Sequence, residues 1–466
     1  MSRMVVRIQE SMDGGTTGFW LESPKAYPQA SKVSPLTSRP DQPPFSEMHN
    51  GDGSPQKVRD AGIKLYNELI LHPAVAPAIA AVLTEKQGGC SPICFRLDDV
   101  TAADDLPWEA VRFNEFLALD QRWPIIRMRE VTEADSRAIY TLEPPLRISV
   151  VLSAAGSTAQ SRAPGAPQWQ RIQDTIEKHL AQKDALPVSV TVFTGEADLL
   201  DVIKSAQKPW AHADLIADKS SLLGKIQNSN PHILHFFCHG ISDQVPHLRV
   251  GSYTDWEAGI EPTIAITASE LRQKADPSQN VWLVSLNCCE SATRAGNVRG
   301  FASSLVAAGF PAALGMREAV EVEHAHLLCQ SFYPEVMKMI GAVQEGGPET
   351  EIEWAKALWQ ARMDLAEKGA VGIPAQTAGE GSKVWTVPAL YVRREPFCLK
   401  RIAPSSEAQV GISQEKKKII EYIQTLQQQR AKAAEDYKDL PPAALNALLS
   451  DIDKQIMLKT AELSKV

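Results

Sequence analysis

The chain has 466 residues, of which 44% are hydrophobic and 22% charged, close to the average of globular proteins. This length allows two or three domains with a full hydrophobic core. The net charge of −8 and the pI near 5.8 argue against direct binding of nucleic acid, because phosphate groups require a basic surface. No motif indicates a cofactor, and none is expected.

Three features predict a cytoplasmic protein that does not enter a membrane. Residues 1–7 lack the apolar core of a signal peptide. The longest apolar run, residues 305–316, is too short to span a bilayer and contains Gly309 and Pro311. Seven cysteines are an odd and low number, which fits a reducing compartment better than a disulfide framework.

The N-terminal part is predicted to contain two regions. Residues 1–56 combine a β-hairpin over 4–22 with a stretch rich in Pro, Ser and Gly over 23–56, interpreted as a mobile linker or long loop. Residues 57–145 are predicted to form a small α+β segment. Its expected elements are helices within 57–86 and strands at 92–97 and 123–127.

Residues 146–402 alternate apolar strands with helical segments. This pattern predicts an α/β domain with a mostly parallel sheet and helices on both faces. Thr267 and Glu270 form a capping box that starts a helix, and the preceding residues 241–265 are expected to be a polar loop. The expected strands are 146–152, 188–193, 233–240, 281–291, 311–316 and 384–392. The expected helices are 169–182, 197–206, 214–228, 298–308, 322–341 and 350–368.

Residues 403–466 are predicted to form a linker and a C-terminal helical hairpin. Apolar residues recur at helical spacing over 413–437 and again over 441–463. The sequence Asp439-Leu440-Pro441-Pro442 separates the two helices, because proline interrupts a helix.

Two of the expected strands end in reactive side chains. The first ends in His239-Gly240, and the second continues into Asn287-Cys288-Cys289. In open α/β sheets, ligands bind beyond the carboxyl ends of the strands. A histidine about fifty residues before a cysteine is the spacing found in caspases, although the caspase signature Q-A-C-x-G is absent.

These stretches resemble the CHAT family, caspase-like proteins of the separase and caspase clan, and in particular its bacterial members. The resemblance covers roughly residues 60–395. It is specific in combination, because each matching piece alone is weak. The matching pieces are residues 106–109, 116–119, 124–127, 146–152, 234–240, 285–292, 305–316 and 385–391.

The resemblance implies a caspase-like fold and a His-Cys dyad. The family's catalytic histidine directly precedes a glycine, which corresponds to His239 here. Its catalytic cysteine lies in a pattern like Leu-Ser-Ala-Cys-Glu-Thr, which places Cys289 as the nucleophile and Cys288 at the alanine position. The doublet leaves Cys288 as an alternative nucleophile. The backbone N–H groups of Gly240 and Cys289 would then stabilise the oxyanion.

Other polar residues lie close to this dyad in the sequence. His235 lies on the same strand face as His239, so it could line the site or be an ordinary core histidine. The histidines and cysteines lack the paired spacing of a zinc site, and no metal is expected. Acidic residues such as Glu318 could favour a basic side chain before the scissile bond, although an exposed glutamate at a helix start is the commoner explanation. The candidates for lining the site are His235, Asn287, Cys288 and Glu290.

The predicted function is that of a cysteine endopeptidase that cleaves a specific partner protein. The resemblance implies a role in bacterial defence or cell death, with a substrate such as a gasdermin-like pore former or another effector. It also implies an activating partner protein. The preceding linker and the two apolar stripes make the C-terminal hairpin the expected docking element, and the equal alternative is that the hairpin simply packs on the protease domain. The alternatives are a catalytically inactive caspase-like interaction module and a thiol acyltransferase.

Overall fold

The computed structural model divides into two compact units, Met1–Arg401 and Ile402–Val466, which are described separately. In the first unit the structure describes residues 3–10, 16–50, 54–86, 89–97, 102–131, 139–158, 161–242, 244–275, 280–288, 300–368 and 382–401. In the second unit it describes residues 402, 422, 425–426, 429–430, 432–433, 437, 449–450 and 452–459.

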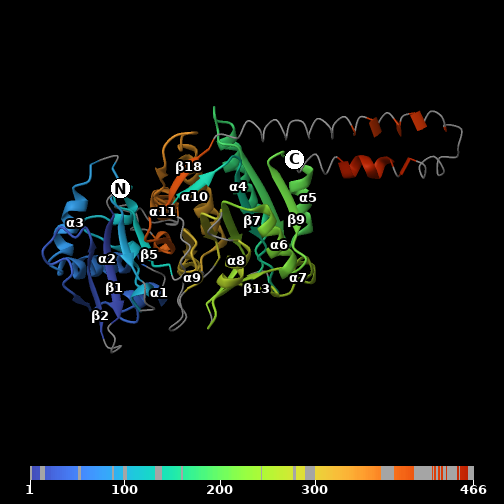
Figure 1. Ribbon diagram of the computed structural model, residues 1–466. Helices are drawn as coiled ribbons and strands as arrows, with labels where there is room; N and C mark the ends of the chain where they lie inside the picture. The colour runs from blue at the N-terminus through green and yellow to red at the C-terminus, as the bar shows by residue number, and fades with distance from the viewer. Residues whose placement is uncertain are drawn as a thin grey trace. The chain divides into compact units, whose positions relative to one another are not determined.

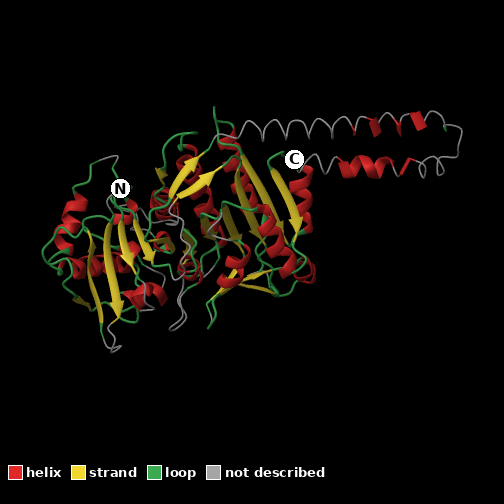
Figure 2. Cartoon of the chain, in the orientation of Figure 1, coloured by secondary structure: helices red, strands yellow, loops and turns green. Residues whose placement is uncertain are grey.

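Twelve strands of the described residues form one mixed sheet (Figures 1 and 2). Their order is β3-β2-β1-β4-β5-β17-β15-β14-β10-β7-β8-β9. The strands before residue 145 are β1 (Met4–Glu10), β2 (Thr17–Ser23), β3 (Ser34–Leu36), β4 (Ile93–Arg96) and β5 (Ile125–Arg129). The others are β7 (Leu146–Leu152), β8 (Val188–Thr194), β9 (Ala211–Leu215), β10 (Ile233–Phe237), β14 (Leu283–Leu286), β15 (Ala312–Met316) and β17 (Pro388–Arg393).

The sheet contains two groups of parallel strands that run in opposite directions. Strands β9, β8, β7, β10, β14 and β15 are parallel to one another. Strands β1, β4, β5 and β17 form the second parallel group, and the direction reverses where β15 pairs with β17. The carboxyl ends of the two groups therefore lie at opposite edges of the sheet.

Helices cover both faces of the sheet, as the strand–helix alternation predicted. In the residues after 145, side chains alternate between two cores: Val150 packs with one face and Val151 with the other. The first core includes side chains of α4 (Ala166–Leu180), α5 (Ala197–Ser205), α10 (Val322–Gly341) and α11 (Ala355–Lys368). The second includes side chains of α6 (Lys219–Ser229), α8 (Ala268–Lys274) and α9 (Phe301–Ala307).

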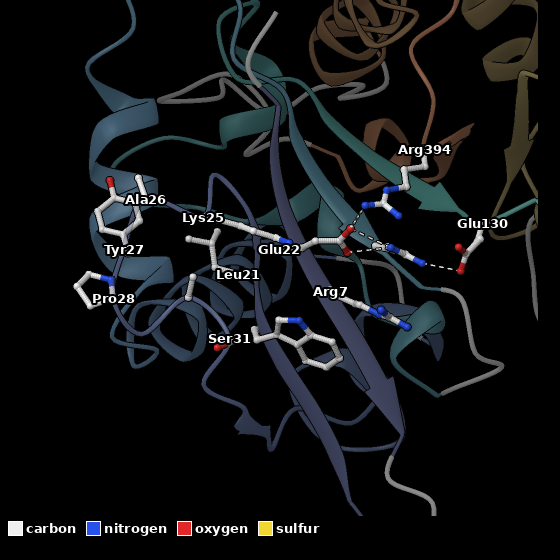
Figure 3. Close-up of a pocket in the computed structure, with 13 residues that line it drawn as sticks. Arg7, Leu21, Glu22, Lys25, Ala26, Tyr27, Pro28, Ser31, Glu130 and Arg394 are labelled. Carbon is white, nitrogen blue, oxygen red and sulfur yellow. Dashed lines mark hydrogen bonds and ion pairs between the residues drawn. The ribbon is translucent and has the colours of Figure 1, made fainter. Parts of the chain in front are cut away.

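Residues 23–56, predicted to be a mobile linker or long loop, contain two short elements. This stretch contains β3 and the helix α1 (Phe45–Asn50), and Phe45 is buried. The stretch is anchored because the Glu68 carboxylate, on α2 (Pro55–Ile70), accepts a hydrogen bond from the Ser38 backbone. The next helix in the chain after α2 is α3 (Val75–Leu83). The connection from β2 to β3 also forms one wall of a cavity of about 790 Å³ on the sheet (Figure 3).

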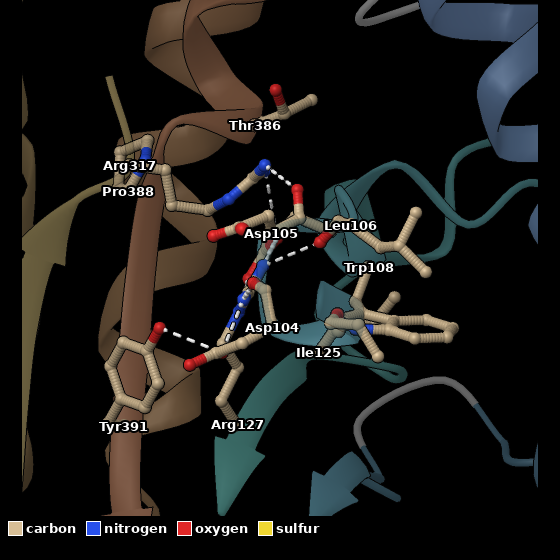
Figure 4. A network of polar contacts seen from close by, with 12 residues as sticks. Asp104, Asp105, Leu106, Trp108, Ile125, Arg127, Arg317, Thr386, Pro388 and Tyr391 are labelled. Carbon is tan, nitrogen blue, oxygen red and sulfur yellow. Dashed lines mark hydrogen bonds and ion pairs between the residues drawn. The ribbon is translucent and has the colours of Figure 1, made fainter. Parts of the chain in front are cut away.

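The expected division at residue 145 does not separate two compact units, because a buried polar network joins the segments on either side (Figure 4). Arg127 on β5 donates to both carboxylate oxygens of Glu109 at 2.9 and 2.8 Å and to Asp104 at 3.0 Å. Tyr391 on β17 donates to Asp104 at 3.2 Å. Arg317, which follows β15, donates to the carbonyl oxygen of Asp105 at 2.7 Å. The sheet thus continues across the sequence boundary.

Three stretches differ from the sequence-based expectations. The expected helix over 214–228 is β9 followed by α6, and the expected strand over 384–392 begins with a 3-10 turn before β17. The expected loop over 241–265 contains most of a second sheet and a helix, α7 (Tyr253–Ala258). That sheet consists of β11 (His239–Ile241), β12 (His247–Val250) and β13 (Ile264–Thr267). The capping box of Thr267 and Glu270 at the start of α8 is confirmed.

A third small sheet packs beside the main one. Its strands are β16 (Thr350–Glu351), β18 (Cys398–Arg401) and β6 (Ile139–Leu142), in that order. In the described part of the chain, no single helix is long and apolar enough to cross a membrane; α2 and α3, bent by 119°, pass that test only as a pair and only by length and composition.

In the second unit, described residues between 422 and 433 and between 449 and 459 are helical, whereas the predicted break at 439–442 lies outside the described residues. Leu426 and Leu449 are buried, and Arg430 forms an ion pair with Asp453. Lys459 lies over the ring of Tyr422 at 5.7 Å. These contacts join residues from the two predicted helices within the unit.

Candidate active site

The candidate site lies beyond the carboxyl ends of the neighbouring parallel strands β10 and β14. The ladder aligns Phe236 with Leu286, and the Asn287 backbone N–H donates to the Phe236 carbonyl oxygen at 2.8 Å. This register brings residues 238–240 beside residues 287–288, as the sequence predicted for the ends of two adjacent strands.

A cavity of about 300 Å³ opens at these strand ends. Five consecutive residues line it, from the last residue of β10 onward, namely residues 237–241. Asn287 contributes from β14, and Ala325 and Val322 contribute from the start of α10. The size suits one amino-acid side chain and its flanking peptide groups.

His239 is held in one orientation by a backbone group. Its Nε2 atom lies 2.8 Å from the carbonyl oxygen of Ala155, and the side chain is half-buried at the cavity wall. A carbonyl oxygen can only accept, so Nε2 carries the proton in this contact. In the neutral ring Nδ1 is then the free acceptor, which is the atom able to take a proton from a thiol.

The Ala155 carbonyl is itself fixed by the backbone around it. The Ser153 N–H donates to the Phe237 carbonyl oxygen at 3.0 Å, and the Gly251 N–H donates to the Ser153 carbonyl oxygen at 3.3 Å. The Ser153 hydroxyl donates in turn to the Gly251 carbonyl oxygen at 2.6 Å. Sequence reasoning did not identify Ala155, since every residue has a carbonyl group and no side-chain signal marks this one.

Glu261 is an acidic residue of the cavity wall that the sequence analysis missed. Its carboxylate accepts a hydrogen bond from the Ser157 N–H at 3.0 Å. The hydrogen bond from the Ser157 side chain lowers the pKa of Glu261 most, and His239 contributes in the same direction. Arg249, opposite His239 in the β11–β12 ladder, also lines the cavity. By contrast, Glu318 does not line it and pairs with Lys383 at 2.9 Å.

The thiol of Cys288 faces away from the cavity. Its Sγ atom lies 3.3 Å from Sγ of Cys238 and 3.5 Å from the carbonyl oxygen of Phe236. Only 1% of Cys288 is exposed, and it belongs to the core that α6, α8 and α9 cover. An approaching substrate therefore has no access to this sulfur atom.

The remaining predicted site residues are placed as follows. Gly240 and Asn287 line the cavity, and the Asn287 side-chain amide donates to the Ala325 carbonyl oxygen at 2.8 Å. Cys289 and Glu290 lie outside the described residues. Of the two residues of the predicted dyad, His239 is therefore the one that lies within the described residues.

His235 is an interior residue and does not line the cavity. Its Nε2 atom lies 3.2 Å from the Gln168 side-chain nitrogen, and its ring meets Tyr333 edge-on at 5.6 Å. Burial lowers the pKa of His235 to about 3, so the ring is neutral at physiological pH. Of the two interpretations of His235, the placement agrees with the core histidine.

The described histidine His232 is buried and held by protein contacts. His232 stacks on Trp282 at 4.2 Å, and its Nδ1 atom accepts from the Arg147 backbone N–H at 3.0 Å. Among the residues that the structure describes, no group of three His, Cys, Asp or Glu side chains could hold a metal ion.

Comparison with solved structures finds the separase–securin complex of Saccharomyces cerevisiae. In the structure at 2.6 Å resolution the identity is 13% and the TM-score 0.35, with 72% of this chain and 18% of that chain covered. In the structure at 3.0 Å resolution the identity is 14% and the TM-score 0.32, with 72% and 17% covered. This chain thus spans less than a fifth of the length of those chains. No curated protein matches it.

The sequence model of the CHAT domain matches residues 59–374. The matched range begins in α2, includes Arg127, Asp104 and Glu109 of the polar network and contains both strand ends at the cavity. It covers more than half of the 466 residues. The chain therefore belongs to the CHAT domain family.

Proposed function

We propose that this chain is a cysteine endopeptidase in which Cys289 is the nucleophile and His239 the acid–base group. The observation that carries the proposal is the contact between His239 and the Ala155 carbonyl at the cavity wall. It leaves the second ring nitrogen of His239 as a proton acceptor at the carboxyl ends of β10 and β14.

The proposed reaction has two steps. The His239 imidazole takes the proton of the Cys289 thiol, and the thiolate attacks the carbonyl carbon of the scissile peptide bond. His239 then donates this proton to the leaving amine, and an acyl-enzyme forms. Water activated by His239 hydrolyses the acyl-enzyme and restores the thiol. In the tetrahedral intermediates, the proposed donors to the oxyanion are the N–H groups of Gly240 and Cys289.

The proposal takes Cys289 rather than Cys288 as the nucleophile because the Cys288 thiol is buried against Cys238. Moving the Cys288 sulfur atom into the cavity would require the strand end to rotate and would expose core side chains. A buried thiol of this kind behaves as a small apolar core residue.

The experiment compares Cys289→Ala with Cys288→Ala in the full chain. An electrophilic cysteine probe should label the wild type and Cys288→Ala at Cys289, and should not label that site in Cys289→Ala. Co-expression with the products of neighbouring genes, followed by mapping of new N-termini, should show cleavage that Cys289→Ala abolishes. The absence of both labelling at Cys289 and cleavage would favour the inactive interaction module, and acyl transfer to an amine in preference to water would favour the acyltransferase.

The substrate and the control of the enzyme are part of the same proposal. We infer that the substrate is a specific protein, such as a gasdermin-like effector in a bacterial defence or cell-death pathway, and that an activating partner protein docks on the second unit. This inference is supported by membership of the CHAT family and by the separate unit Ile402–Val466. The proposed compartment is the cytoplasm.

A further inference from the structure

The cavity between β2 and the β2–β3 connection lies at the opposite edge of the sheet from the candidate active site. Strands β4, β5 and β17 are parallel, and their carboxyl ends point away from those of β10 and β14. Three charged residues of the cavity wall occupy these ends: Arg96 ends β4, Glu130 follows β5 and Arg394 follows β17. This is the position at which open α/β sheets bind ligands.

The other walls come from the N-terminal hairpin and the connection that follows it. Arg7 on β1 lies over the ring of Trp20 on β2, with its guanidinium carbon 5.3 Å from the ring centroid. Lys25 and Tyr27 stand on the connection that closes the far side (Figure 3). The volume of about 790 Å³ is that of a site for a small organic molecule rather than a single ion.

The arginines at the strand ends are held in place by two carboxylates. The Arg96 side chain is only 3% exposed and donates to Glu22 at 2.9 and 3.0 Å and to Glu130 at 2.6 Å. Glu22 also pairs with Arg394 at 3.1 Å, although 53% of the Arg394 side chain is exposed. The guanidinium groups are thereby fixed before any ligand arrives, which reduces the entropy lost on binding.

The cavity carries an excess of positive charge. Its wall contains four cationic side chains and two carboxylates. Lys25 is exposed and forms no ion pair with any residue that the structure describes. Lys25 therefore contributes a positive charge that neither carboxylate of the wall pairs with. The four cations are Arg7, Lys25, Arg96 and Arg394, and the two carboxylates are Glu22 and Glu130.

We propose that this cavity is a second ligand site, independent of the peptidase proposal, and that it binds a small phosphate monoester. A phosphate monoester carries about two negative charges at pH 7, which suits a wall with four cationic side chains and two carboxylates. Arg394 offers the planar fork that suits phosphate oxygens, and Lys25 offers a mobile ammonium group. The space beside Trp20 accommodates the organic part of the ligand, and a ring there can pack on the indole.

The test measures binding to the full chain by isothermal titration calorimetry with phenyl phosphate, glycerol 3-phosphate and inorganic phosphate, with phenol as the uncharged control. Both esters should bind saturably and phenol should not. Removing one cation should weaken ester binding about tenfold, as expected for one charge-assisted hydrogen bond. The absence of saturable binding of either ester up to about 10 mM would overturn the proposal.

Substitutions at three exposed positions are expected to change the affinity for the esters differently: one lowers it, one raises it and one leaves it unchanged. Lys25→Gln should weaken binding of the esters, whereas Glu130→Gln should tighten it, because 56% of the Glu130 side chain is exposed and its loss leaves the wall more positive. Lys32→Gln removes an exposed lysine outside the cavity wall and should have no effect. Binding that is equally strong in all three variants would show that the esters bind elsewhere and would reject this site.

Discussion

The imidazole of His239 and the backbone carbonyl of Ala155 are joined at 2.8 Å across two neighbouring strand ends. Ala155 follows β7, and His239 follows β10, so the contact depends on the spacing of these two adjacent strands. A change that displaces residues 153–155 should therefore disturb the histidine without touching it.

Gly251→Ala provides such a change. A Cβ atom at Gly251 would lie 2.5 Å from Cβ of Ala155 and 3.0 Å from Oγ of Ser153, closer than packed atoms tolerate. We expect a loss in kcat/KM of about 10²-fold, because displacements of about 1 Å in a catalytic group have effects of this size. Gly224→Ala on α6 is the matched control: its Cβ would meet nothing within 4 Å, and alanine should stabilise the helix by about 0.5–1 kcal/mol.

Kinetics of substrate cleavage, measured together with the urea midpoint of unfolding, distinguish a loss of catalytic activity from a loss of stability. In Gly251→Ala the activity should fall in protein that is still folded, because overpacking costs about 1–3 kcal/mol of stability. Full activity of Gly251→Ala would contradict the orienting role of the Ala155 carbonyl.

The sequence allowed the strand ends of the site to be predicted, because long apolar runs before His239 and Asn287 are typical of buried parallel strands. The Ala155 carbonyl has no sequence signal. Glu261 lies in a region that was predicted to be a loop, because β11, β12 and β13 have only three or four residues each and lack a clear period. Nothing in the sequence therefore indicated that this glutamate would lie beside His239. Strand β9, Ala-His-Ala-Asp-Leu, is similarly poor in β-branched residues.

The continuity of the sheet was not predictable for a different reason. Strand β5 pairs with β17, which lies far away in the sequence, and local patterns carry no information about such pairing. The charged residues Asp104, Glu109 and Arg127 are of types that are normally exposed, yet the pairing buries them completely or almost completely. Their interaction becomes visible only once the two segments are placed together.

Arg127→Met should destabilise the chain by about 3–5 kcal/mol, because it leaves the buried Glu109 carboxylate without its main partner and leaves Asp104 with Arg129 as its remaining arginine. Arg122→Met is the control. Arg122 pairs with Asp120 at 2.6 Å in a partly exposed position, where an ion pair contributes about 0–1 kcal/mol. Urea unfolding at neutral pH measures both, and equal losses in the two variants would refute the proposed importance of burial.

The same network should make the chain sensitive to acid. Burial alone would raise the pKa of Asp104, but Arg129 and Arg127 outweigh it and lower that pKa; Arg127 lowers the pKa of Glu109 in the same way. The folded chain thus binds these protons more weakly than the unfolded chain. The stabilisation is complete above the ordinary carboxyl pKa of about 4 and is lost as the pH falls through the lower folded-state values. Urea midpoints should decline less steeply with acid in Arg127→Met than in the wild type.

Glu196 should produce a pH dependence of opposite sign. Burial raises the pKa of Glu196 to about 7, although its carboxylate accepts a hydrogen bond from the Gly165 N–H at 2.7 Å. The folded chain binds this proton more tightly than the unfolded chain, so stability falls as the pH rises from about 4.3 to 7. Glu196→Gln, which keeps an acceptor for Gly165, should remove this fall. Urea midpoints that change identically with pH in the variant and the wild type would show that Glu196 does not cause this fall in stability.

A chain shortened to residues 1–401 should separate folding from activation. The boundary between the compact units lies at residues 401–402, and the main sheet, both cores and the cavity at His239 belong to the first unit. We therefore expect an unchanged urea midpoint for that unit and unchanged labelling of Cys289 by an electrophilic probe. Cleavage that depends on the activating partner should be lost, because the proposed docking element is Ile402–Val466. Partner-dependent cleavage at the full rate by the shortened chain would place the docking site on the first unit instead.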